Sequence, residues 1–320
     1  CSLSAEDEKT MLAWVASGAA EGDPTQTPAP PQFISGWQLP KEPDYVCDIM
    51  PKPYKVKATG DIPYKHFVVD PKFTEDKWVR AAEMRPSCLG VVHHILCFVV
   101  PADAKSLEQE IDGFLVGYVP GMLPPALPDG YAKKIKAGSK LVFQVHFTPN
   151  GREQLEQSRL GLVFADDASV THEVLTTCAV NPKITIPAND PNYTIKARNR
   201  FPLGEWPILG MMPHMHLRGK SFRYEAILPD GKHEVLLDVP RFDFNWQTSY
   251  QFAEPLNLPA KTRIECVAAF DNSSANLNNP DPSQTVRWGD QTWEEMMIGY
   301  FDVAIPKAEA EKIRDKMLRR

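Results

Sequence analysis

The chain has 320 residues, of which 43% are hydrophobic and thirty are prolines, and its formal net charge is −6. This length suits two domains, and a proline share about twice the average favours short strands joined by turns over an all-helical protein. The acidic balance gives no basic face for nucleic acid. No apolar run approaches the roughly 18 residues of a membrane-spanning helix. We therefore expect a folded, β-rich protein with no nucleic-acid partner and no transmembrane segment.

Residues 1–31 are expected to form a helix followed by a linker. Ser4 precedes Asp7 by three residues, which is a helix-capping pattern, and the following EKTMLAWVASG is amphipathic. GDPTQTPAPP at 22–31 is typical of an extended linker. The helix resembles the last helix of a class I c-type cytochrome, although no C-x-x-C-H haem motif accompanies it. An upstream cytochrome domain is therefore one expectation, and an ordinary N-terminal helix is the alternative.

The first residue is Cys1 rather than methionine, which gives two interpretations. Cys1 is either the lipid-carrying first residue of a lipoprotein or an internal residue of a longer protein, and we favour the second because a helix begins at once. The six cysteines permit disulfides, but their spacing does not determine the connectivity.

From about residue 37 onward the pattern indicates strands and turns. SKLVFQVHFT alternates with period two, and SFRYEAIL and HEVLLDV flank a Pro-Asp-Gly-Lys turn. Such a pattern predicts an all-β fold of two antiparallel β-sandwiches in tandem. We expect the domains at 32–168 and 169–306, with a short C-terminal helix over 307–320.

Six potential metal ligands fall into two groups of three. They are His93, His94 and His146, then His214, His216 and Met296. Imidazole suits copper, zinc, iron and nickel, and a thioether shifts the preference toward Cu(I). The grouping therefore predicts two copper ions per chain, one held by three histidines and one by two histidines and a methionine.

The local spacing supports part of this prediction. His214 and His216 project from the same face if they lie on a strand, and Met215 then points to the core. Neighbours such as His93 and His94 reach one metal only if the strand bends, which Gly90 could permit, and the alternative is that one of them is a core histidine.

The motifs that carry these residues resemble a known family. HH in an apolar strand (93–94), Q-V-H (144–146), H-x-H-L-x-G-K (214–220) and E-E-M (294–296) are similar to those of the ascorbate-dependent type II copper monooxygenases, in the same order. The resemblance implies two jelly-roll sandwiches that share a solvent-filled cleft. It further implies an electron-donating copper at the first site and an oxygen-binding copper at the second. Gln144 matches a residue beside the first copper, and Tyr300 matches a tyrosine near the substrate.

Some positions depart from the family pattern. Where the peptide-hydroxylating members have an arginine two residues before H-x-H, this chain has Met212, and Ile298 replaces the polar residue after the ligand methionine. Met297 stands where the family has a cysteine, so Cys266 lacks its expected disulfide partner. These departures argue against a carboxylate-bearing peptide and favour an apolar pocket.

The leading hypothesis is a copper-dependent monooxygenase that hydroxylates a C–H bond of a small, uncharged molecule with O2. Ascorbate or a haem protein would supply the electrons. The alternative is a non-enzymatic copper-binding or electron-transfer module of a larger assembly. Either would suit a periplasmic or extracellular location, with lipid anchoring at Cys1 if the lipoprotein interpretation holds.

Overall fold

The computed structural model describes residues 3–32, 34–102, 113–122 and 126–318, and the chain separates into two compact units, 1–36 and 37–320. In the first unit, helix α1 (Ala5–Ala16) is capped as predicted, because the Ser4 hydroxyl accepts from the Asp7 N–H at 3.1 Å. Gly18, with φ at +97°, lies just past its end. The apolar side chains of α1 are exposed in this unit.

The first sandwich of the second unit consists of two four-stranded sheets. One has the order β1-β10-β4-β7 and the other β3-β8-β5-β6, and a short β2–β9 ladder lies beside them. The strands are β1 (Tyr45–Asp48), β2 (Tyr54–Val56), β3 (Lys65–Val69), β4 (Lys77–Arg85), β5 (Val92–Val100), β6 (Phe114–Tyr118), β7 (Tyr131–Ile135), β8 (Lys140–Phe147), β9 (Gln154–Glu156) and β10 (Arg159–Ala165).

The second sandwich repeats the arrangement. Its sheets have the orders β11-β20-β14-β17 and β13-β18-β15-β16, with a short β12–β19 ladder. The strands are β11 (His172–Val180), β12 (Thr185–Ile186), β13 (Tyr193–Arg198), β14 (Ile208–His214), β15 (Gly219–Ile227), β16 (His233–Val239), β17 (Tyr250–Leu256), β18 (Arg263–Phe270), β19 (Val286–Arg287) and β20 (Ile298–Pro306).

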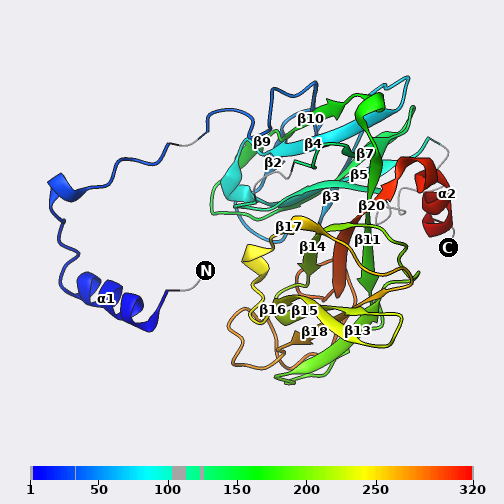
Figure 1. Cartoon of the computed structure of the whole chain (residues 1–320). Coiled ribbons are helices and arrows are strands. Elements are labelled where there is room, and N and C mark those ends of the chain that lie inside the picture. Colours follow the sequence, from blue (N-terminus) through cyan, green and yellow to red (C-terminus); the bar gives the residue numbers. More distant parts are fainter. Residues whose placement is uncertain (1–2, 33, 103–112, 123–125, 319–320) are drawn as a thin grey trace. The chain divides into compact units, whose positions relative to one another are not determined.

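Both sandwiches are jelly rolls. If the eight main strands of each are counted in chain order, the two sheets read 1-8-3-6 and 2-7-4-5 in both cases, which is the jelly-roll order. The predicted fold class, all-β with two such sandwiches and short terminal helices, is therefore confirmed. A parallel pairing of β7 with β11 joins one sheet of each sandwich into an eight-stranded sheet, and Figure 1 shows the two sandwiches one above the other.

The alternation of apolar and polar residues along a strand determines which side chains face the core. On β8, Leu141, Phe143, Val145 and Phe147 are buried in the core of the first sandwich, while Gln144 and His146 take the opposite face. The Pro-Asp-Gly-Lys segment joins β15 to β16 in a hairpin as expected, with Gly231 at φ +84°. Helix α2 (Lys307–Leu318) follows β20.

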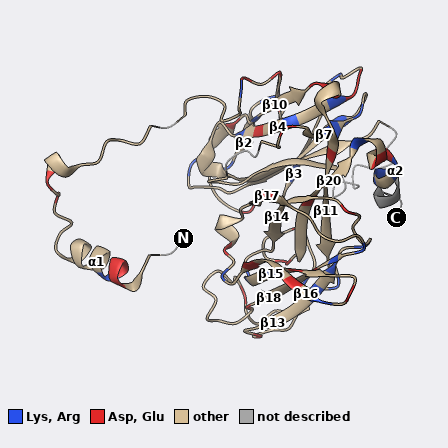
Figure 2. Cartoon of the chain, viewed as in Figure 1, with Lys and Arg blue, Asp and Glu red and all other residues tan. Residues whose placement is uncertain are grey.

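The surface carries both signs of charge. Figure 2 shows Lys and Arg interspersed with Asp and Glu over both sandwiches, in keeping with the modest net charge. Among the described residues, neither helix is long and apolar enough to cross a membrane.

Candidate metal centres and the adjoining pocket

A β-bulge brings His93 and His94 to one place. The pairing of β5 with β8 shifts register between Val92 and His94, and His94 lies directly opposite His146. A bulge inserts an extra residue and re-aims its side chain, so neighbours that would point to opposite faces can converge. The ligand atoms of His93, His94 and His146 all lie within 4.8 Å of one another.

The atoms of this first cluster fit a metal ion. The Nδ1 atoms of His93 and His94 are 3.5 Å apart, close to the roughly 3.3 Å expected for two nitrogens that each lie about 2.05 Å from a tetrahedral ion. Nδ1 of His146 is buried and has no hydrogen-bond partner. Since buried polar atoms in proteins are normally partnered, this nitrogen is suited to a ligand.

Gln144 supports the same arrangement from the neighbouring position. Its Oε1 lies 3.4 Å from Nε2 of His94. An amide oxygen only accepts, so Nε2 carries the hydrogen and the Nδ1 lone pair is left for an ion. This is the position beside the first cluster that the sequence predicted for Gln144.

In the second cluster, the ring nitrogens available to a metal are Nε2 rather than Nδ1. His214 ends β14, His216 lies just beyond it, and their ring centres are 5.2 Å apart. Nδ1 of His214 donates to Oε1 of Gln247 at 2.7 Å, and Nδ1 of His216 donates to the Glu294 carbonyl at 3.1 Å. Both acceptors fix the tautomer with the hydrogen on Nδ1. Nε2 of each ring therefore keeps a lone pair for a metal.

The backbone on both sides of Met296 is anchored to this segment. The carboxylate of Glu295 accepts from the His216 N–H at 2.8 Å and from the Arg218 N–H at 2.6 Å. On the other side, Ile298 pairs with His214. Met296 is half-buried between these two anchor points, and Met215 lies in the core as expected.

Burial keeps these imidazoles neutral. It lowers the pKa of His146 and of His214 to about 4 and that of His216 to about 3. A charged ring loses hydration on burial, so its protonated form is disfavoured. At neutral pH the nitrogens therefore hold lone pairs rather than protons, as metal ligation requires.

One aromatic ring lies between the two clusters. Phe244, in the single-turn 3-10 helix Phe244–Trp246, stacks on His93 with ring centres 4.7 Å apart and planes inclined by 18°. Its centre also lies 6.0 Å from that of His216, edge to face. The resemblance implied a solvent-filled cleft, but here a ring that is only 7% exposed occupies the space.

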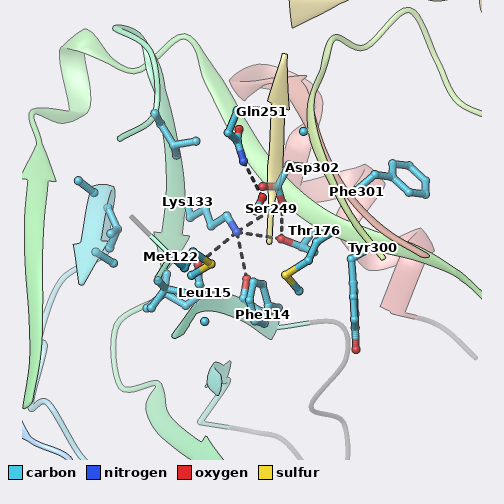
Figure 3. Close-up of a pocket in the computed structure, with 18 of the residues that line it drawn as sticks. Phe114, Leu115, Met122, Lys133, Thr176, Ser249, Gln251, Tyr300, Phe301 and Asp302 are labelled. Atoms are coloured by element: carbon cyan, nitrogen blue, oxygen red, sulfur yellow. Dashed lines mark hydrogen bonds and ion pairs between the residues drawn. The ribbon is translucent and has the colours of Figure 1, made fainter. Parts of the chain in front are cut away.

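A pocket lies between strands β4 and β6 of the first sandwich and β14 and β20 of the second (Figure 3). Most of its lining is apolar, including Leu115, Met122, Met211, Met212 and Phe301. Tyr300 lines it too, directly opposite Met212 on the neighbouring strand.

The same strand carries both the pocket wall and a histidine of the second cluster. His214 follows Met212 by two residues on one face of β14, a step of about 6.6 Å. Ile298, which the sequence grouped with this pocket, is buried to 3% exposure and pairs with His214.

The two cations of the pocket wall are each paired with a carboxylate: Arg80 lies 2.8 Å from Asp129, and Lys133 lies beside Asp302. The Lys133 ammonium donates to Oγ1 of Thr176 at 2.8 Å and to the Leu115 carbonyl at 3.2 Å, and it lies 3.5 Å from Oδ1 of Asp302 (Figure 3). The Thr176 hydroxyl also donates to Asp302. The charges of Lys133 and Asp302 therefore offset each other, and the pocket suits an uncharged ligand.

A second group of possible ligands is less suited to a cation. Glu225, His233 and Glu265 cluster on the outer face of the second sandwich. The two carboxylates are ion-paired with Arg223, Lys196 and Arg198. A divalent cation would have to compete with these three charges.

Three contacting residues were not found by sequence reasoning. They are Tyr64, whose ring centre lies 4.8 Å from that of His146, together with Phe244 and Gln247. The DFNW segment indicates a turn, and Asp243 does accept from the Asn245 N–H at 2.8 Å. Nothing local indicates that the turn lies against histidines some 30 to 150 positions away in the chain.

Comparison with known proteins adds little to this geometry. No protein-family profile matches the chain, and no curated protein matches it. A solved structure described as that of infectious bursal disease virus Gt strain is similar over 88% of this chain and 76% of that chain, at 10% identity and a TM-score of 0.24. A likeness at this level carries no argument about function.

The Gln247 contact gives a first prediction. Gln247→Ala is expected to weaken copper binding at the second cluster by about 10- to 100-fold, because His214 loses the acceptor that fixes its tautomer and orientation. Binding at the first cluster should be unchanged. Stepwise copper titration against a competing chelator measures both affinities. Gln251→Ala is the matched control, since Gln251 bonds to Ser249 instead, and an equal loss in that variant would contradict the assignment.

Proposed function

We propose that this protein is a copper-dependent monooxygenase that hydroxylates a C–H bond of a small, uncharged molecule. The observation that carries the proposal is the meeting of two histidine clusters beside a largely apolar pocket. In the first cluster the ligand atoms lie within 4.8 Å of one another, and in the second both Nδ1 atoms are hydrogen-bonded, so that Nε2 of each ring remains for a ligand. Copper bound at the two clusters would supply one electron each for the reduction of O2, and an external reductant such as ascorbate or a haem protein would restore them.

The chain's own residues would prepare the site for this reaction. Gln247 and the Glu294 carbonyl hold the His214 and His216 rings in one tautomer. The pocket would hold the substrate's apolar body beside β14. Burial raises the pKa of Tyr300 above its usual value, so its phenol stays protonated and can donate a hydrogen bond to a substrate oxygen.

The second candidate is a non-enzymatic copper-binding or electron-transfer module. The cytochrome-like sequence of α1 motivates it. A protein that only passes electrons has no need of a substrate pocket, so an apolar pocket lined by β14, the strand that carries His214, favours the enzyme.

Copper stoichiometry and oxygen uptake test the proposal. We expect two coppers per chain and ascorbate-dependent oxygen uptake with an apolar C–H substrate. His146→Ala and Met296→Ala should each lower the stoichiometry toward one or weaken one site, and both should abolish uptake, because each removes a ligand of a different site.

His172→Ala is the matched control. His172 stacks on Tyr131, away from both clusters, with ring centres 4.9 Å apart. This variant should keep both coppers and full uptake. Two bound coppers without oxygen uptake for any substrate would favour the electron-transfer module. Fewer than two in the unaltered protein would contradict the monooxygenase, and none would contradict both candidates.

A further inference from the structure

The turn that carries Phe244 contacts three of the five histidines. Phe244 itself lies against His93 and His216. Three residues later, Gln247 accepts from His214 through Oε1 and donates through Nε2 to the Phe244 carbonyl at 3.1 Å. One side chain therefore fixes both the turn and a histidine of the second cluster.

The turn also reaches the first sandwich at another point. A Cβ atom added at Gly121 would come within 3.2 Å of the Trp246 ring, so Trp246 packs closely on the backbone there. Phe244 and Trp246 thus make two separate contacts across the sandwich boundary from a turn that the Asp243 side chain holds in shape.

The chemistry of Phe244 suits a spacer. Its ring carries no hydrogen-bonding group and cannot act as a metal ligand. It is nearly fully buried, so it keeps water out of the volume that its ring fills between His93 and His216. Because it touches a ring on each side, the ring centres of His93 and His216 lie no farther apart than the sum of the two separations.

We propose that Phe244 is a positioning residue that holds the two histidine clusters at a short, fixed separation and keeps the space between them dry. The proposal rests on the proposed function only in taking the clusters as metal sites. Electrons would then pass between the sites across packed side chains rather than across a solvent gap. Exclusion of water would also limit the loss of reactive oxygen species to side reactions.

A metal-free experiment tests the packing. Hydrogen exchange at the imidazole C2 position, followed by mass spectrometry, reports how accessible each histidine ring is. In the apo protein, Phe244→Ala is expected to speed exchange at His93 and His216 by about tenfold or more, because the ring that covers both is removed. Phe244→Leu keeps apolar bulk there and should stay close to the unaltered protein.

Two controls separate this effect from general loosening. Exchange at His172, remote from the turn, should not change in any variant. Asn245→Ala alters an exposed neighbour in the same turn and should leave His93 and His216 as they are. Equal exchange at His93 and His216 with and without the Phe244 ring would overturn the proposal, and so would faster exchange at all histidines alike.

A second measurement uses the copper-loaded protein. With Cu(II) at both sites, the unaltered protein should show dipolar broadening and a half-field transition in its electron paramagnetic resonance spectrum. Both should weaken in Phe244→Ala and persist in Phe244→Leu. If the unaltered protein bound two ions without magnetic coupling between them, the short separation would be contradicted, but the proposed function would not be. Failure to bind two ions would contradict the proposed function, and the exchange experiment would still decide the role of Phe244.

Discussion

Replacing Glu295 by alanine is expected to lower the free energy of unfolding by about 3–5 kcal/mol, the cost of stranding a buried charge. Glu295 is fully buried and accepts from the main chain of His216 and Arg218. Arg218 is itself only 2% exposed, and its guanidinium otherwise bonds to neutral oxygens of Asn272 and Trp293. Without Glu295, this buried cation would lose the carboxylate whose charge most favours it.

The same substitution should release the segment that carries His216. Two backbone N–H groups would be left without acceptors, and the backbone on one side of Met296 would lose its anchor. Copper affinity at the second site should therefore fall with stability, while the first site keeps its affinity. Chemical denaturation and site-resolved copper titration measure the two effects.

Glu295→Gln is the matched variant. It keeps the shape and one acceptor oxygen, but its NH2 group must face one of the two N–H donors. We expect a smaller loss of about 1–3 kcal/mol. Burial raises the pKa of Glu295, and the N–H donors and Arg218 oppose this rise, so the negative charge is stable only while these partners are in place. If the two variants lost equal free energy of unfolding, the hydrogen bonds from the His216 and Arg218 N–H groups would not be the contribution of Glu295.

Much of the architecture could be predicted from sequence because its signals are local. The alternation in β8, the capping by Ser4 and the turn between β15 and β16 each depend on a few adjacent residues. The two histidine groups were also readable, since H-x-H fixes two side chains on one short segment; the placing of Met296 with the second group stays a prediction. The need for a bend at His93 followed from strand geometry, and the structure supplies it as a bulge.

The rest depends on contacts that no local pattern encodes. Phe244 reaches His93 only because the second sandwich packs against the first. Gln247 reaches His214 from 33 positions away within the second sandwich, and the segment of both residues shows no more than a turn. The parallel pairing of β7 with β11 is likewise a tertiary contact. An apolar pocket was anticipated from Met212 and Ile298, of which Met212 lines it, but its charged wall was not. Lys133 and Asp302 belong to different sandwiches, more than 150 residues apart in the chain.

The ion pair of Lys133 and Asp302 in the pocket wall gives the last prediction. Lys133→Met is expected to destabilise the protein by about 3 kcal/mol, since it leaves Asp302, 22% exposed, without its cation. Lys133→Met combined with Asp302→Asn should lose only about 1 kcal/mol. No charge is then stranded, and the amide oxygen can still accept from the Thr176 hydroxyl. Denaturant unfolding of both single variants and the double variant measures the coupling between the two residues.

The size of that coupling also bears on the ligand. Because the ammonium of Lys133 is already engaged by Thr176, Leu115 and Asp302, an anionic ligand could bind it only by displacing Asp302. A strong coupling would make that displacement costly, and the pocket would favour uncharged molecules. If the double variant lost as much stability as the two single variants together, the pair would be uncoupled. Lys133 would then be free to recognise an anion, and the proposed substrate class would have to change.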